Sequence, residues 1–395
     1  MEEFELRNQI LLGEDSTRQF KRELSMPSRI AGEIVAFANS GGGSIFFGVE
    51  RDGTIAGLSG HEAGRVGEEM AKLAWDSVRP PFSILSRSIP TSDGIVVVIE
   101  IPDGASKPYC DNKGVYWVKN GPDKRRVQSP EELARLFQSG DKLYAESQVV
   151  AASAMNDFDH DRFERFYETK YAESPPSRSE ESEAYQTLLE NLELVHSGRL
   201  TVAGLLLFGK RLPILLPEMK IDAIWFKGNG RASSDWHDQA TISGTLADQY
   251  QESMGFLKRW NARQQLEGSF NQPGLLTVPE LVFEELLTNA LVHRDYFIKD
   301  SIKLFIFADR IEIRSPGKLP NSLTVEQIRR GVRRSRNALL ASFAPDLLNY
   351  RGVGSGIVRA LKAWPFIVWV NDTEAEEVVV TIQSSPDSSA RRNQP

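Results

Sequence analysis

AFANSGGGSIFFGVERDGTIAGL, residues 36–58, is the stretch that decides the fold of the first part of the chain. A helix-like segment ends at three glycines (41–43), and an apolar run over 44–50 follows at once. Asp52-Gly53 is a tight-turn pair, after which extended chain resumes, so residues 44–58 are predicted to form a β-hairpin. The three glycines could bring backbone N–H groups close to an anion, although glycines in such a pattern more often form a simple turn.

Outward from this stretch, helical and extended patterns alternate. Apolar residues at helical spacing predict a helix over 28–38, and IVVVIEI (95–101) and VYWV (115–118) predict short buried strands. Ser129 followed by Glu132 is a capping-box pattern that opens a helix over 130–137. Residues 1–140 are therefore predicted to form one α/β domain.

The second part of the chain has a different pattern. Residues 141–200 are acidic and mostly helical in pattern, and we interpret 141–275 as a mostly helical connecting region, within which 200–208 is either a strand or a buried helix. A second α/β domain is predicted over 276–383, with a helix at 280–292 and strands at 301–307, 310–315 and 377–382. The polar tail, 384–395, is predicted to be disordered.

Composition narrows the class of protein. Hydrophobic residues make up 41% of the 395 residues and charged residues 26%, which is typical of a globular protein and excludes a mainly disordered chain. The single cysteine, Cys110, excludes an internal disulfide framework and is typical of the cytoplasm, where we expect the protein. No apolar run approaches the roughly 18 residues of a membrane span, so no membrane partner is expected.

The net charge of −7 hides two basic segments, 107–126 and 326–336, each with a net charge of +4. In the first segment, cations alternate with Tyr109, Tyr116 and Trp117, and cations with stacking rings are the ingredients of a nucleic-acid surface. The alternative is a strand with core rings on one face and solvated lysines on the other. The candidate nucleic-acid-binding residues are Lys21, Lys107, Lys113, Trp117, Lys119, Lys124, Arg125 and Arg126.

A third group of motifs is ELLTNALVHRDY (285–296) with RGVGSGI (351–357). Glu285 and Asn289 are four apart and share one face of a helix, where a carboxylate can activate water and an amide oxygen can ligate magnesium. Glycines at a helix start let backbone N–H groups reach phosphates; here they are Gly352, Gly354 and Gly356.

The second basic segment lies between these motifs. We take Arg336, within RRGVRRSRN (329–337), as a candidate contact to a terminal phosphate, and a solubilising loop is the alternative. The five histidines lack metal-ligand spacing, and no Walker loop or Ser-His-Asp signature is present.

The N-terminal motifs, continuing through 107–140, resemble the AlbA-like Schlafen domain, a nucleic-acid-binding module. Some Schlafen members are metal-dependent RNases that use two Glu and one Asp. The resemblance places the first Glu at Glu14, the Asp at Glu50 or Asp52, and the second Glu at Gln19. A neutral amide supplies no carboxylate charge to a divalent metal, so we expect no robust nuclease activity.

The C-terminal motifs, over about 280–382, resemble the GHKL ATPase module of histidine kinases and gyrases, a Bergerat-type α/β sandwich. The nearer likeness is to the RecG-related branch attached to Schlafen-like domains in bacterial regulators. The resemblance implies ATP and magnesium as cofactors, Glu285 as the water-activating acid, Asn289 as the magnesium ligand and the 352–356 glycines as the phosphate loop. Gly317 belongs to the adenine-reading D-x-G box, but Ser315 stands near the position of its Asp.

The sequence therefore predicts an α+β protein: an AlbA-like domain, a helical connector and a Bergerat-type sandwich. The expected function is binding of DNA or RNA under control of an ATP-binding module, as in a transcriptional regulator or defence protein, with weak ATPase activity left open. A homodimer is implied by resemblance to GHKL proteins. The alternatives are a Schlafen-like RNase and a binding scaffold whose nucleotide pocket has lost its function.

Overall fold

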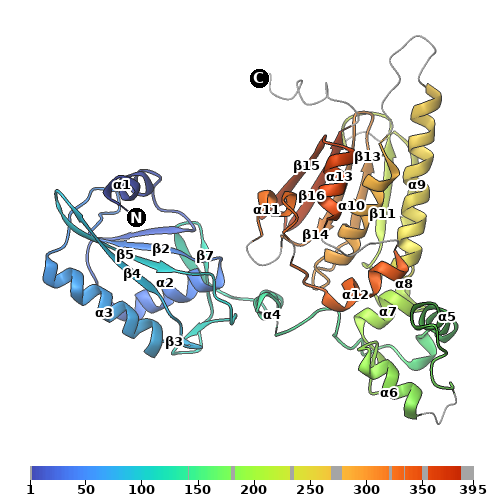
Figure 1. Cartoon of the computed structure of the whole chain (residues 1–395), viewed down its shortest axis with the longest axis horizontal. Coiled ribbons are helices and arrows are strands. Elements are labelled where there is room, and N and C mark those ends of the chain that lie inside the picture. The colour runs from blue at the N-terminus through green and yellow to red at the C-terminus, as the bar shows by residue number, and fades with distance from the viewer. Residues whose placement is uncertain are drawn as a thin grey trace. The chain divides into compact units, whose positions relative to one another are not determined.

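The computed structural model describes residues 2–140, 142–178, 183–231, 235–267, 278–319, 323–332, 334–348 and 355–383. The chain divides into two compact units, Met1–Leu143 and Tyr144–Pro395, and each combines helices with a main sheet (Figure 1). The predicted α+β class is confirmed. Within the described residues, no helix is long and apolar enough to span a bilayer. The tail expected to be disordered, 384–395, lies outside these residues.

The first unit is built on a four-stranded sheet in the order β1-β2-β5-β4. Strand β1 (Arg18–Lys21) runs parallel to β2 (Gly43–Phe47), while β5 (Gly94–Ile101) is antiparallel to both β2 and β4 (Leu85–Thr91). One core contains side chains of α2 (Pro27–Asn39), α3 (Gly60–Asp76) and the sheet, and a smaller core lies against α1 (Glu3–Leu11). The expected strand at 95–101 is confirmed as β5.

The prediction of a β-hairpin over 44–58 is wrong, because the two halves of this segment do not form a continuous hydrogen-bonded ladder with each other. β2 pairs with β1 on one side and β5 on the other, so residues 55–58 form no continuous ladder with it. They make two isolated bridges instead, Val49–Ile55 and Leu58–Ile95, and the second of these joins β5. The glycine run allows close packing at the start of β2. Gly42 has φ +83°, and a Cβ there would lie 2.7 Å from the carbonyl oxygen of Ile101. The turn interpretation therefore accounts for these glycines.

Small elements complete the first unit. A hairpin of β7 (Trp117–Asn120) and β8 (Asp123–Arg126) lies against α2, and β3 (Val78–Arg79) pairs with β6 (Cys110–Asp111). Helix α4 (Pro130–Ser139) begins as predicted, because the Ser129 hydroxyl oxygen accepts a hydrogen bond from the Glu132 backbone N–H.

The second unit begins with short elements: η1 (Met155–Asp157), α5 (His160–Tyr171), α6 (Glu183–Asn191), β9 (Val195–His196), β10 (Arg199–Leu200), α7 (Val202–Phe208) and α8 (Leu212–Leu215). The segment 200–208, which the sequence left open, is mainly the buried helix α7, whose first turn is capped by the Thr201 hydroxyl.

The main sheet of the second unit has six strands in the order β12-β11-β13-β14-β16-β15. They are β11 (Ile221–Phe226), β12 (Trp236–Ile242), β13 (Ile302–Ile306), β14 (Arg310–Pro316), β15 (Ile367–Asp372) and β16 (Glu377–Gln383). The long helices α9 (Leu246–Glu267) and α10 (Glu280–His293) pack against it, and α11 (Val325–Arg329), α12 (Ala338–Leu347) and α13 (Gly356–Ala363) follow α10 in the chain.

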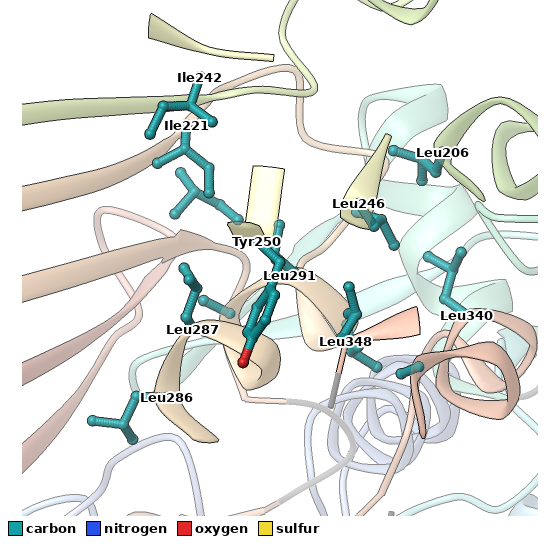
Figure 2. Packing of buried hydrophobic residues seen from close by; sticks show 14 of the residues in the cluster. Leu206, Ile221, Ile242, Leu246, Tyr250, Leu286, Leu287, Leu291, Leu340 and Leu348 are labelled. Atoms are coloured by element: carbon teal, nitrogen blue, oxygen red, sulfur yellow. The ribbon is translucent and has the colours of Figure 1, made fainter. Parts of the chain in front are cut away.

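The helical interpretation of 141–275 fails for β11 and β12, which hydrogen-bond into this sheet. IDAIWF (221–226) is a short apolar run interrupted only by Asp222, and periodicity alone does not separate such a run from a buried helix segment. Figure 2 shows side chains from α7, α9, α10 and α12 meeting residues of β11 and β12 in one core. That core extends from Ala145 to Ile382, so the connector and the C-terminal segment fold together.

Candidate functional site

A cavity in the second unit brings together the predicted nucleotide-binding segments. Helix α10 forms one wall of the cavity. Strand β14 and the turn after it form the second wall, and the first residues of α13 form the third. The lining residues are Leu286, Asn289, Ala290, His293, Ile313, Ser315, Gly317, Lys318, Leu319, Leu323, Ile328, Gly331, Val332, Arg334, Gly356, Ile357, Trp369, Val378 and Val380. Most are apolar, and Lys318 and Arg334 add positive charge.

Three predicted cofactor residues, Asn289, Gly317 and Gly356, line this cavity although they come from separate segments of the chain. The Nδ2 atom of Asn289 is buried and has no hydrogen-bond partner among the described residues. A buried amide without a partner carries a desolvation cost that a polar ligand group would relieve. Gly352 and Gly354 lie outside the described residues.

The turn after β14 explains the glycine of the Ser315-Pro316-Gly317 sequence. Gly317 has φ +104°, and a Cβ there would lie 2.4 Å from Cβ of Asp295. Ser315 lines the cavity at the expected position of the missing Asp, and its hydroxyl donates to the carbonyl oxygen of Ala290 at 3.0 Å. A neutral hydroxyl, rather than a carboxylate, therefore faces this end of the cavity.

Glu285, the predicted water-activating acid, lies on α10 one turn before Asn289 but does not line the cavity. Its carboxylate is buried and forms an ion pair with Arg359 of α13. The predicted pairing of Glu285 with Asn289 on one helix is thus present, while the carboxylate is engaged by a cation.

Arg336 also does not line the cavity. Its guanidinium lies 3.3 Å from Asp295 and donates to the carbonyl oxygen of Lys318, which fixes the turn that carries Gly317. Sequence reasoning missed Arg334 and Lys318, which lie two residues before Arg336 and directly after Gly317. It also missed His293, although its four-residue spacing from Asn289 on a helix places both on one face.

In the first unit, much of the predicted nucleic-acid-binding strip is paired internally. Glu33 of α2 accepts from Lys124 at 2.5 Å, and its second oxygen lies 3.9 Å from Nζ of Lys119. Burial lowers the pKa of Lys119, and the nearby Glu33 carboxylate offsets part of that effect. Lys107 is buried and paired with Asp103. These three lysines are therefore paired with acidic side chains of their own unit.

Trp117 has a structural partner as well. Its Nε1–H donates to Asp111 at 2.9 Å, and the cations of Lys124 and Arg126 lie 5.5 and 5.3 Å from its ring. Arg125 donates to Glu132 at 3.0 Å but remains exposed.

The exposed cations of the strip are Lys113, Arg125 and Arg126, and Lys21 at the end of β1 is half-buried. Packing of Tyr109 in the core and of Trp117 against it explains part of the strip. The exposed cations keep the nucleic-acid hypothesis open.

The residues of the nuclease alternative are engaged within the fold. Glu14 accepts from the Phe20 backbone N–H at 2.8 Å, and Glu50 lies 3.1 Å from Arg22. Asp52 accepts from the backbone N–H of Thr54, which lowers the pKa of Asp52. Gln19 is buried in β1. In the part of the chain that the structure describes, no three His, Cys, Asp or Glu side chains gather as a metal site.

Comparison with protein families gives three matches. Residues 14–128 match the model described as "Schlafen, AlbA_2", and residues 299–365 match "Putative ATP-dependent DNA helicase recG C-terminal", an HATPase_c_4 domain. Residues 134–222 match a "Domain of unknown function (DUF8451)". The chain thus contains a Schlafen AlbA_2 domain and a RecG-related HATPase_c_4 domain, and the two resemblances drawn from the motifs are confirmed. A search of curated proteins finds no match.

Two solved structures are similar at low identity. The DIP2311 protein from Corynebacterium diphtheriae is 18% identical with a TM-score of 0.45, over 94% of this chain and 65% of that chain. This chain thus spans less than two thirds of the length of that protein. The N-terminal domain of a "Putative ATP-dependent DNA Helicase RecG-related Protein" from Nitrosomonas europaea is 16% identical with a TM-score of 0.25, over 33% of this chain and 96% of that chain.

Proposed function

We propose that the second unit binds a purine nucleoside triphosphate with magnesium in the cavity between α10, β14 and α13. The observation that carries the proposal is the meeting of Asn289, Gly317 and Gly356 at one cavity with Lys318 and Arg334. Apolar walls suit a base, and the two cations suit phosphates. The match to an HATPase_c_4 model over 299–365 supports the same ligand class.

Asn289 is the residue that would hold magnesium through the nucleotide. Magnesium prefers oxygen ligands and usually keeps waters and substrate phosphates in its shell, so one amide oxygen from the protein is sufficient. The unpartnered Nδ2 of Asn289 fits an acceptor on the nucleotide, and the amide can present its oxygen after a rotation about its last bond. When bound, magnesium would neutralise phosphate charge.

The first unit, in this proposal, binds DNA or RNA through its exposed cations. Lys113, Arg125 and Arg126 would pair with phosphates, with Lys21 as a further candidate. Lys107, Lys119 and Lys124 would support the surface from within rather than contact phosphates, because their partners are acidic side chains of the same unit. Arg126 over Trp117 would present a stacked cation.

At the level of the whole chain, we propose a nucleotide-gated nucleic-acid-binding protein that acts in the cytoplasm as a homodimer, in regulation or defence. The Schlafen AlbA_2 match over 14–128 and the RecG-related match over 299–365 support the pairing of these two activities in one chain.

Calorimetric titration of the full chain with ATP, with and without magnesium, tests the nucleotide site. The wild type should bind magnesium-ATP, and Asn289→Ala should lose the magnesium-dependent part of the affinity. Asn191→Ala, at an exposed position on α6 in the same unit, is the matched control and should bind as the wild type does. Equal binding by Asn289→Ala and the wild type would refute the assigned ligand, and absence of binding would favour the scaffold alternative.

A further inference from the structure

The carboxylate of Glu285 is held by two features of α13. Arg359, one turn into that helix, pairs with it directly, and the Glu285 side chain is only 5% exposed. Gly356, at the first position of α13, packs against the same carboxylate, because a Cβ on Gly356 would lie 2.1 Å from Oε2. A negative charge near the start of a helix is also stabilised by the helix dipole. The carboxylate therefore fastens α13 to α10.

The Glu285 carboxylate that pairs with Arg359 is the same group that would accept a proton from water during catalysis. In hydrolysis, a water oxygen attacks the terminal phosphorus and passes its proton to a carboxylate. The bond from that phosphorus to the bridging oxygen breaks, and the bridging oxygen leaves with the electron pair on the diphosphate. A carboxylate whose lone pairs accept from a guanidinium is a weaker base for that water. Arg359 is well suited to this hold, because guanidinium groups bind carboxylates in a fixed planar geometry.

We propose that Arg359 is a positioning residue that restrains Glu285, so that the protein binds magnesium-ATP but turns it over slowly. The inference rests on the proposed nucleotide site and concerns what happens after binding. Glu285 and Arg359 do not line the cavity, but the Glu285 carboxylate packs against Gly356, which does. In this proposal the ion pair therefore changes turnover and leaves the nucleotide contacts themselves unchanged.

Substitution of Arg359 tests this restraint. Arg359→Gln should raise kcat for ATP hydrolysis by at least about tenfold, since general-base catalysis contributes roughly 10² to 10⁴ in rate. KM and the Kd for magnesium-ATP should stay within about twofold of the wild type. Glu285→Gln combined with Arg359→Gln should remove the gain, because the base is then absent. A purely structural ion pair would not produce a rise in kcat that depends on Glu285.

Two further variants keep the test decisive. Arg359→Lys retains the positive charge beside Glu285, so it should fold more readily than Arg359→Gln. It loses the planar guanidinium that pairs with this carboxylate, so it should still raise kcat severalfold. Arg259→Gln, on α9, removes an exposed ion pair of 3.2 Å with Asp238 of β12 and should leave kcat unchanged. Intact binding with no rise in kcat in Arg359→Gln or Arg359→Lys would overturn the inference alone. Failure of the wild type to bind magnesium-ATP would overturn both the inference and the proposed nucleotide site.

Discussion

Glu146 provides a quantitative prediction about stability. This glutamate lies near the start of the second unit and is 1% exposed, and its carboxylate accepts from the backbone N–H groups of Leu339 and Leu340 at 2.9 and 2.7 Å. Burial raises the pKa of Glu146 from 4.5 to about 7. The two backbone hydrogen bonds work against that rise, and the nearby charge of Glu193 adds to it.

The direction of the pH effect follows from this pKa. The folded protein holds the Glu146 proton more tightly than the unfolded chain, so ionisation at high pH destabilises the fold. This penalty is fully present above about pH 7 and is lost as the pH falls toward 4.5. The difference between a pKa of 4.5 for this carboxyl in the unfolded chain and about 7 in the folded protein corresponds to about 3 kcal/mol in the free energy of unfolding.

Glu146→Gln removes this ionisation and should remove its pH dependence. Urea denaturation followed by tryptophan fluorescence reports mainly on the second unit, which holds five of the seven tryptophans. The stability of the wild type relative to Glu146→Gln should fall by about 3 kcal/mol between pH 4.5 and 8. Glu252→Gln, at an exposed position on α9, should keep the wild-type dependence. Parallel pH profiles for the wild type and Glu146→Gln would refute the reasoning.

Three further predictions concern ligands. Replacing Lys113, Arg125 and Arg126 with neutral residues should weaken nucleic-acid binding alike for all sequences and reduce the salt slope by about one unit per lost phosphate contact; unchanged affinity and slope would contradict the assigned surface. Purified protein should not cut structured RNA with magnesium or manganese, because Gln19 stands where the resemblance requires an acid; rapid cutting that Glu14→Ala abolishes would show this to be wrong. ATP and GTP should bind with Kd values within about tenfold, because Ser315 presents a hydroxyl where the resemblance requires Asp; strong preference for ATP in a competition titration would contradict this.

The sequence predicts much of the fold where local signals are strong. The capping residue Ser129, the apolar run of β5 and the long helix α10 all appear as expected. Strands β11 and β15 were missed, because short strands in the middle or at the edge of a sheet depend on distant partners that no local pattern reveals. Residues 44–58 form no hairpin ladder for the same reason: β1 and β5 are the neighbours of β2.

The candidate site shows the same limit. Helical spacing placed Asn289 and Glu285 on one helix, and two glycines of the motifs, Gly317 and Gly356, line the same cavity as Asn289. The sequence could not show that Arg359 binds Glu285 or that Glu33 binds Lys124, because each pair joins residues more than 70 positions apart. Charge counting treats such cations as available, whereas packing determines which of them face solvent.

The central claim is that the cavity of the second unit binds magnesium-ATP, and a thermal-shift titration of the full wild-type chain tests it most directly. Ligand at a hundredfold over Kd stabilises the folded state by about 2.7 kcal/mol, which raises Tm by a few degrees in a unit of this size. We predict such a rise with magnesium-ATP and a smaller one with ATP and a chelator. An unchanged Tm with either ATP or GTP, in the presence of magnesium, would contradict the account.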